Sequence, residues 1–380
     1  MRLAGPEASP PQVWAIEDTA LQLTWGRLPP GPVTACAADR TVTVEHGGGP
    51  GSLDLDGLPP GAELDVELAW DGGRAHLVAT TLTPPPGELL TRFATISDMH
   101  LGAANWGALR RMTDDSGHPV PHPLRCASAA VAEAVAWGAD LLVIKGDGVQ
   151  HECDAHFSQL GQLVDAHPHL PMLLMPGNHD VDGRPGSIPL AVGRRGLPFI
   201  RHADHVDRPG VRIVAADTTI RGRGTGSIDR VAGPIEELID GADRPVFLAL
   251  HQQLQPTRWP RYWPAGIAAP ASTRFLDRLD RHHRPIIVSS GHTHRNRSRT
   301  HGSVLLTEVG STKDWPGVWG GYAVHEGGIR QVIRRIAAPT AIRWTEYSRG
   351  ALGGLWGLWS PGRLHQRCIS HRWVGARSYV

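Results

Sequence analysis

Five short apolar runs in the sequence are each followed by residues of the types that bind metal ions. The runs are FATIS, LLVIK, MLLM, VFLAL and IIVSS. The polar residues that follow them are Asp98, His100, Asp147, Asn178, His179, Asp180, His251, His292 and His294. Carboxylate, amide and imidazole groups without thiolates suit iron, manganese or zinc. The pattern therefore predicts a metal centre built from several loops.

The apolar runs have the length and composition of buried strands, which places the polar residues at strand ends. In α/β sheets, ligands bind beyond the carboxyl ends of the strands. Residues two apart in an extended chain point to the same side, so Asp98 and His100 can reach one centre, as can His292 and His294.

The order of these blocks resembles the calcineurin-like metallophosphoesterases. D-x-H, GD, GNHD, a lone His after a strand and GHTH follow one another within residues 92–310. The resemblance implies that Asp98, His100 and His294 hold one metal ion. It implies that Asn178, His251 and His292 hold a second ion and that Asp147 bridges the two. It also implies that His179 is the general acid, oriented by Asp180.

The chemistry implied by this resemblance is hydrolysis of a phosphate ester. Two metal ions can clamp a phosphoryl group and activate a bridging water for attack on phosphorus. An imidazole such as that of His179 can then protonate the leaving oxygen. The ligand types do not choose among Fe, Mn and Zn.

The blocks are most similar to those of the cyclic-nucleotide phosphodiesterase group within the superfamily. Purple acid phosphatases fit less well because GDGVQHE contains no tyrosine, and DNA-repair nucleases fit less well because the net charge is only +1. We therefore expect a phosphodiesterase for small molecules such as cyclic nucleotides. A phosphomonoesterase, a nucleotide-sugar pyrophosphohydrolase and a non-catalytic metal-binding scaffold remain as alternatives. The filled ligand positions and His179 favour an enzyme over a scaffold.

Residues 89–342 alternate between strand and helix patterns, which predicts an α/β catalytic domain. The resemblance implies the four-layer α/β/β/α sandwich of the calcineurin-like fold. Expected helices lie at Leu124–Trp137, Ala155–Ala166, Pro234–Ile239 and Ser272–Arg281. Strands without intervening helices, which are candidates for a second sheet, are expected at Val304–Val309, Tyr322–His325 and Ile329–Ile336.

Residues 1–88 show the alternation of short strands separated by PPG and GGGPG turn signals. They predict a small all-β sandwich similar to a fibronectin III module, with strands at Ala20–Trp25, Thr41–Glu45, Ala62–Trp70 and Arg74–Thr81. Residues 343–380 form a Trp/Arg/Gly-rich tail in which regular structure is expected to fade. Packing onto the core is favoured for its tryptophans over membrane contact or nucleic-acid stacking.

Net charge and composition limit the binding partners and the cellular location that the sequence supports. A net charge of +1 gives no strong nucleic-acid signal, and no apolar run is long enough to cross a membrane. The four scattered cysteines suit a reducing compartment, so we expect a soluble, cytoplasmic protein. The resemblance implies a small phosphate ester as its substrate. The sequence leaves homodimer formation open.

Several other residues are weaker candidates for the site. Arg221, Arg223 and Arg295 could contact phosphate, although solvated loop charge is an equal alternative. His151 and Glu152, which follow the GD block, could line the substrate pocket. The remaining loop histidines, with surface positions as their default interpretation, are His118, His122, His156, His167 and His169.

Overall fold

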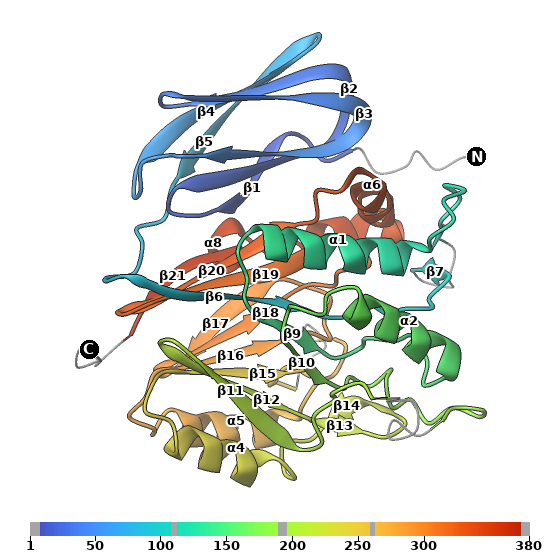
Figure 1. The fold of residues 1–380 in the computed structure, drawn as a ribbon, viewed down its shortest axis with the longest axis vertical. Helices are drawn as coiled ribbons and strands as arrows, with labels where there is room; N and C mark the ends of the chain where they lie inside the picture. Colours follow the sequence, from blue (N-terminus) through green and yellow to red (C-terminus); the bar gives the residue numbers. More distant parts are fainter. Residues whose placement is uncertain (1–7, 108–111, 189–195, 259–262, 374–380) are drawn as a thin grey trace.

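The core of the protein is a pair of six-stranded sheets that pack face to face (Figure 1). The structure is a computed structural model that describes residues 8–107, 112–188, 196–258 and 263–373. The first sheet has the strand order β10-β9-β6-β19-β20-β21 and the second the order β11-β12-β15-β16-β18-β17. Both sheets contain parallel strands whose carboxyl ends meet at one edge.

The first sheet combines three parallel strands with three antiparallel ones. Its strands are β6 (Leu89–Ile96), β9 (Leu142–Lys145), β10 (Met172–Met175), β19 (Val318–His325), β20 (Gly328–Arg335) and β21 (Cys368–Arg372). The strands of the second sheet are β11 (Ala203–Arg208), β12 (Val211–Ala216), β15 (Val246–Leu250), β16 (Ile286–Ser290), β17 (Arg297–His301) and β18 (Val304–Glu308). The late strands therefore divide between the sheets: β18 continues the second, whereas β19 and β20 extend the first.

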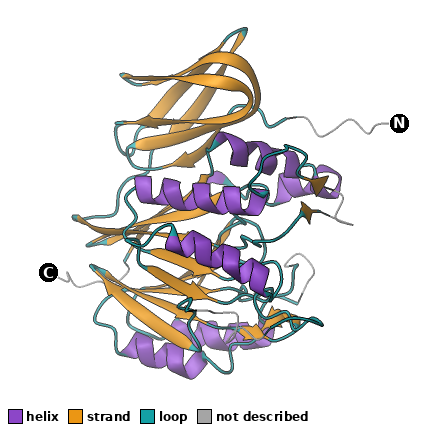
Figure 2. Ribbon diagram, turned by 45° about the vertical axis from the view of Figure 1, so that its right-hand side comes forward, coloured by secondary structure: helices purple, strands orange, loops and turns teal. Residues whose placement is uncertain are grey.

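Helices cover the outer face of each sheet, which completes four layers (Figure 2). The first sheet is covered by α1 (His122–Ala136), α2 (Asp154–Asp165) and α6 (Pro339–Ser348), and the second by α4 (Ala232–Asp240) and α5 (Ala269–Leu279). Side chains of a strand alternate between its two faces. Leu142 and Ile144 accordingly pack under the helices, whereas Val143 joins Phe93 and Phe247 between the sheets. The predicted α/β/β/α architecture is confirmed.

The N-terminal region is one five-stranded antiparallel sheet with longer strands than the sequence predicts. Its strands are β1 (Gln12–Ile16), β2 (Ala20–Ala37), β3 (Arg40–Asp56), β4 (Glu63–Trp70) and β5 (Gly73–Thr80). The PPG at residues 59–61 lies in the turn between β3 and β4, as predicted. The predicted turns at residues 29–31 and at GGGPG are wrong, because these segments pair with each other inside the β2–β3 hairpin, with Pro30 opposite Gly47. The pairing of β2 with β3 is irregular between Trp25 and Leu28. The similarity to fibronectin III stays a prediction.

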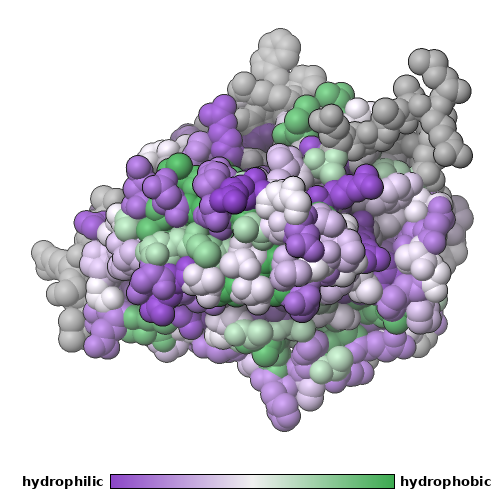
Figure 3. Space-filling view, turned by 90° about the horizontal axis from the view of Figure 1, so that it is seen from above, coloured by the Kyte–Doolittle hydropathy of each residue, from purple (hydrophilic) through white to green (hydrophobic). Residues whose placement is uncertain are grey.

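The N-terminal sheet is joined to the catalytic core by buried polar contacts. The Gln22 side chain exchanges two hydrogen bonds with the backbone of Arg335, each 2.8 Å long. The Glu17 carboxylate lies 2.7 Å from the guanidinium groups of both Arg330 and Arg334. Figure 3 looks down on this end of the molecule, where hydrophilic residues are interspersed with smaller apolar areas. The sheet and the core are thus packed against each other along one continuous interface.

The expectation that order fades after Arg343 is wrong. This part of the chain forms α6, η3 (Ala351–Gly354), α7 (Leu355–Trp359), α8 (Leu364–Arg367) and β21. β21 pairs with β20, so it is the edge strand of the first sheet. Trp344, Trp356 and Trp373 are buried, as the packing interpretation requires, and Trp359 is 40% exposed. The boundaries at residues 88 and 342 stay predictions, and residues 1–7 and 374–380 lie outside the described parts.

Two short hairpins lie near the carboxyl edge of the sheets. They are β7 (Asn105–Trp106) with β8 (Met112–Thr113), and β13 (Thr219–Ile220) with β14 (Arg223–Gly226). His122, interpreted from sequence as a surface residue, is buried with its ring 3.8 Å from that of Trp344. Burial and the nearby Lys313 lower the pKa of His122 to about 3. No helix in the described part of the chain has the length and apolar character of a membrane span.

Candidate metal centre

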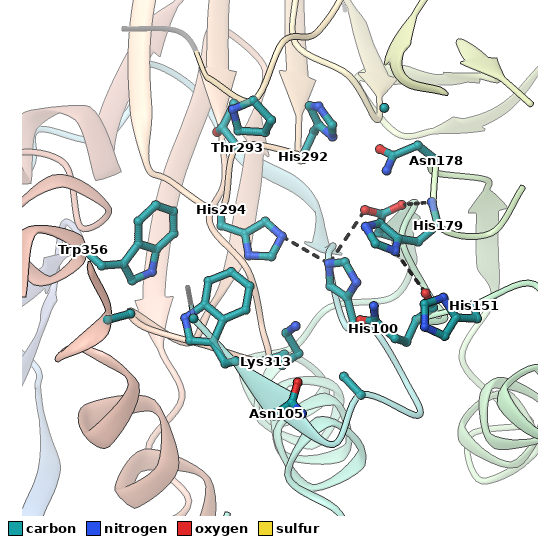
Figure 4. Close-up of a pocket in the computed structure, with 18 of the residues that line it drawn as sticks. His100, Asn105, His151, Asn178, His179, His292, Thr293, His294, Lys313 and Trp356 are labelled. Carbon is teal, nitrogen blue, oxygen red and sulfur yellow. Dashed lines mark hydrogen bonds and ion pairs between the residues drawn. The ribbon is translucent and has the colours of Figure 1, made fainter. Parts of the chain in front are cut away.

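The seven predicted ligand residues converge at the edge where β6, β9, β10, β15 and β16 end. Asp98, His100 and His294 place one ligand atom each within 4.8 Å of one another, as do Asp147, His251 and His292. His100 Nε2 lies 3.2 Å from His294 Nε2, and the Asn178 Oδ1 atom lies 3.1 Å from His251 Nε2. The structure therefore brings all seven side chains into one cluster, of which Figure 4 shows His100, Asn178, His292 and His294.

Asp147 lies between the two groups. Its Oδ2 atom is 3.7 Å from His100 Nε2, in the first group, and its Oδ1 atom is 3.4 Å from His251 Nε2, in the second. The backbone amide of His179 also donates a 2.8 Å hydrogen bond to Asp147 Oδ1. A carboxylate in this position can contact ions on both sides.

Hydrogen bonds fix the orientation of three of the histidine rings. The Nδ1 atom of His251 lies 2.8 Å from the Lys145 carbonyl, and that of His294 lies 2.8 Å from the Asp314 carboxylate. His292 Nε2 lies 3.2 Å from the carbonyl of Ala265. Each ring has one nitrogen held by an acceptor, which leaves the other nitrogen as the ligand atom.

The backbone around the cluster is strained. The described chain has seven non-glycine residues with positive φ, and five of them are Asp98, His100, Asp147, His292 and His294. This region is costly for residues with a Cβ and is often found at functional sites. The strain is concentrated at the predicted ligands, as expected where side chains must be aimed at a common point.

Two glycines allow the loops to approach closely. A Cβ on Gly177 would lie 2.2 Å from the backbone nitrogen of Asp147. Gly146 has a φ of +81°, and a Cβ there would lie 2.7 Å from both Gly177 N and His251 Nδ1. These contacts explain why the GD and GNHD blocks contain glycine before the ligand residue.

The electrostatic environment favours positive charge. Burial lowers the pKa of the His294 ring, but Asp314 and Asp98 outweigh it and raise the pKa to about 10. Burial also lowers the pKa of His251, but Asp147 and Asp98 outweigh it and raise the pKa to about 9. Asp98, Asp147 and Asp314 thus give the surroundings of His251 and His294 a negative potential that also attracts a metal cation. The other two ligand histidines differ, because burial lowers the pKa of His292 to about 4 and that of His100 well below its usual value.

His179 lies beside the cluster, with its ring centroid 4.6 Å from that of His100. Its Nδ1 atom lies 3.0 Å from the carbonyl oxygen of Gln150. The prediction that Asp180 orients His179 needs correction. Asp180 is buried, and its carboxylate accepts hydrogen bonds from the backbone amides of Gly148, Val149 and Gly177. Asp180 ties the GD and GNHD loops together, and the Gln150 carbonyl holds the His179 ring.

The cluster opens into a cavity of about 810 Å³. Several of its walls were not predicted from the sequence. Trp106 stacks on His294 at 5.2 Å with an interplanar angle of 7°, and Trp356 lies 5.9 Å from Trp106. Lys313 also lines the cavity. Only the tryptophan content of the tail gave a signal for any of these residues, and it did not place Trp356 at the cavity.

The weaker site candidates from the sequence differ in their positions relative to the cavity. His151 lines the cavity, whereas Glu152 is buried and pairs with Arg221 at 2.5 Å. Arg295 is also buried; it donates to the Trp263 carbonyl and lies 4.2 Å from the Trp359 ring. Arg223 lines a depression of about 400 Å³ next to His292, so it is the one of the three arginines placed near the cluster.

Comparison with known families agrees with this geometry. The sequence profile of the calcineurin-like phosphoesterases matches residues 91–296, which is more than half of the chain. The chain belongs to the calcineurin-like phosphoesterase family. It is therefore a metal-dependent phosphoesterase, and its donor set fits the divalent ions that this family uses, since it supplies carboxylate, amide and imidazole groups without a thiolate.

The chain is also similar to solved structures that are distant in sequence. PhoD is 11% identical with a TM-score of 0.45, over 88% of this chain and 87% of that chain. The purple acid phosphatase PPD1 from yellow lupin (Lupinus luteus) is 14% identical with a TM-score of 0.45, over 88% and 72%. Comparison with curated protein sequences gives no match. Likeness at this level says nothing about the substrate of the present phosphoesterase.

Proposed function

We propose that this phosphoesterase is a dinuclear-metal phosphodiesterase for small molecules such as cyclic nucleotides. The observation that supports it best is the convergence of seven ligand side chains and His179 on one cavity. A cavity of about 810 Å³ is within the range of roughly 300–1,000 Å³ that small-molecule sites occupy. The cytoplasm is the proposed location, and a homodimer is compatible with the proposal.

In this proposal Asp98, His100 and His294 hold one ion, and Asn178, His251 and His292 hold the other. Asp147 contacts both. The ions, when bound, supply Lewis acidity that neutralises phosphoryl charge and lowers the pKa of water. Iron, manganese and zinc all suit these ligands.

His179 is the proposed general acid. Because its Nδ1–H donates to Gln150 O, the Nε2 atom is the one available to the substrate. A protonated Nε2 can donate to the leaving oxygen, a contribution of about 10²–10⁴ in rate. Asp180 acts at a distance, by holding the loops that carry Asp147 and His179.

An apolar wall favours a diester over a monoester. Trp106, Trp263, Leu352 and Trp356 all line the cavity, and Trp106 and Trp356 contact the ring of His294. A phosphodiester carries a second ester group that such side chains can contact, and a phosphomonoester lacks this group.

The proposal is tested with the Mn²⁺-loaded protein on bis-p-nitrophenyl phosphate, p-nitrophenyl phosphate, cyclic mononucleotides and a nucleoside diphosphate-sugar. We expect the diesters to have the highest kcat/KM. His179→Ala should lower kcat by about 10²–10⁴ at unchanged metal content. The matched control is His169→Ala, since His169 is exposed and is not among the residues that line the cavity. Preference for the monoester or the sugar nucleotide would overturn the substrate assignment, and absence of all turnover would favour a scaffold.

A further inference from the structure

Lysine is rare in this chain, and both of its lysines lie inside the protein. Only Lys145 and Lys313 are lysines among the 38 lysine and arginine residues. Their exposed fractions are 0% and 2%. The Lys145 ammonium has partners, because it donates to Ser289 Oγ at 2.8 Å and to the Ser290 carbonyl at 2.9 Å. Lys145 is therefore a satisfied structural group.

Lys313 is different. Its Nζ atom lies 4.5 Å from the centre of the Trp106 ring, and the contacts of the described residues give it no hydrogen-bond acceptor. The neighbouring carboxylate is occupied, since Asp314 binds His294 through Oδ2 and Trp356 through Oδ1. A buried ammonium without an acceptor is costly unless a partner arrives. Because Lys313 lines the cavity, that partner can come from a ligand.

The position of Lys313 is suited to the phosphoryl group. Its charge is close enough to His100 to contribute, after burial, to the low pKa of that ring. Figure 4 shows Lys313 beside His100 and His294 rather than beside Asn178 and His292. The Lys313 ammonium thus places a positive charge beside His100 and His294, on the face of the Trp106 ring.

The aromatic side chains around Lys313 define the rest of the subsite. Two contacts fix the Trp106 ring: it stacks on His294 and makes a cation–π contact with the Lys313 ammonium. The Trp356 indole is fixed by hydrogen bonds from Nε1 to Asp314 Oδ1 and to the Trp315 carbonyl. Leu352 extends the apolar surface along the same wall. Fixed indoles of this kind contact flat apolar groups at little conformational cost.

We propose that Lys313 and the wall formed by Trp106, Leu352 and Trp356 are the ester subsite of this enzyme. Lys313 donates to a non-bridging phosphoryl oxygen, and the wall contacts a planar aromatic or heteroaromatic ester group. The substrate class is then a phosphodiester monoanion with at least one aromatic or heteroaromatic ester group. This inference rests on the proposed phosphodiesterase function and narrows its substrate.

Binding of inorganic phosphate to the Mn²⁺-loaded protein tests the role of Lys313 without turnover. Lys313→Met keeps the volume and removes the charge; we expect its Kd for phosphate, by titration calorimetry, to rise about 10–100-fold, as for loss of a hydrogen bond to a charged group. Lys313→Arg should recover most of the loss. The control Arg74→Met removes an exposed cation, whose side chain is 68% exposed, and should leave Kd unchanged. An unchanged Kd in Lys313→Met at full metal content would refute the inference.

The wall is tested with two phosphonates of equal charge. We expect phenylphosphonate to bind more tightly than methylphosphonate to the wild-type protein, and Trp106→Leu to reduce this affinity ratio about 2–13-fold, as for loss of an aromatic contact. Equal ratios in the two proteins would remove the aromatic part of the substrate class.

Reductive methylation of the wild-type protein provides a test that needs no variant to fold. Mass spectrometry should find Lys313 methylated, Lys145 unmodified, and Lys313 protected by phosphate. Lys313 methylated equally with and without phosphate would contradict the proposal. If the binding results hold but no diester is hydrolysed, the phosphodiesterase function fails while the anion subsite stands. If diesters are hydrolysed and Lys313→Met binds phosphate normally, only the subsite fails.

Discussion

Asp314 offers the sharpest test of how the metal centre is supported. Its carboxylate is fully buried and lies 2.8 Å from His294 Nδ1, on the far side of the ring from the ligand cluster. A carboxylate in this place fixes the ring orientation and raises the basicity of the ligand nitrogen. Asp314→Asn keeps the shape of the side chain and removes the charge.

The expected size of the effect follows from the contact. Loss of a carboxylate that supports a ligand histidine typically weakens metal binding about 10–100-fold. This corresponds to about 1.4–2.7 kcal/mol, since each factor of ten is about 1.4 kcal/mol. Asp314 also accepts a hydrogen bond from Trp356 Nε1, so part of any effect could arise through that bond. Trp356→Phe removes only the indole donor and is the matched control, with an expected change below about threefold.

The measurement is Mn²⁺ affinity by competition with a chromophoric chelator, combined with urea unfolding of the metal-free protein. Asp314→Asn should lose affinity while the metal-free protein keeps its cooperative unfolding. Wild-type metal affinity in Asp314→Asn would refute the reasoning that this carboxylate supports the centre. Equal losses in Asp314→Asn and Trp356→Phe would assign the effect to the indole contact instead.

Three further predictions concern stability, each measured by urea unfolding. The folded-state pKa of His122 is about 3, so its contribution is present above the unfolded pKa near 6.5 and is lost as pH falls below it. Between pH 8 and pH 5 the wild type should therefore lose about 2 kcal/mol more than His122→Phe, and equal losses would contradict the cause. Gly146→Ala should destabilise by about 2 kcal/mol or more, because φ is +81° and the added Cβ clashes, whereas Gly161→Ala in α2 has open space and should not destabilise. Glu17→Gln should lower stability by about 1.5–3 kcal/mol, because it removes one carboxylate from the buried guanidinium groups of Arg330 and Arg334 and leaves Asp18 and Asp54 as their partners. Glu67→Gln, in a more exposed pair, should change it by less than about 1 kcal/mol. Similar effects for the two glutamates would refute the buried ion-pair argument.

The catalytic core could be predicted because local patterns and long-range structure agree there. The run LLVIK is apolar on both faces, and both faces are covered, by helices on one side and by the second sheet on the other. The ligand residues follow such strands directly, so the rule that strand ends form sites was enough to group them. Sheet membership was harder, because the pairing of β19 with β6 joins residues more than two hundred positions apart and has no local signal.

Three features could not be predicted because they depend on contacts with other parts of the chain. The PPG at residues 29–31 and the GGGPG segment look like turns, but they are paired with each other within the β2–β3 hairpin. The residues after Arg343 have weak local preferences, and β21 forms because β20 offers an edge. Asp314 and Lys313 lie in the stretch GSTKDW, which matches none of the five blocks. Their roles became visible only when His294 and Trp106 were placed beside them.

The position of Trp356 in the cavity wall also has a consequence for biosynthesis. Ribosomes make a chain from its amino end, so all seven predicted ligand residues exist before Trp356 and β21 have been translated. A chain that ends before this segment lacks both the edge strand of the first sheet and one side of the cavity, although it contains every predicted metal ligand. The last segment to be made thus completes the substrate pocket without adding to the metal centre.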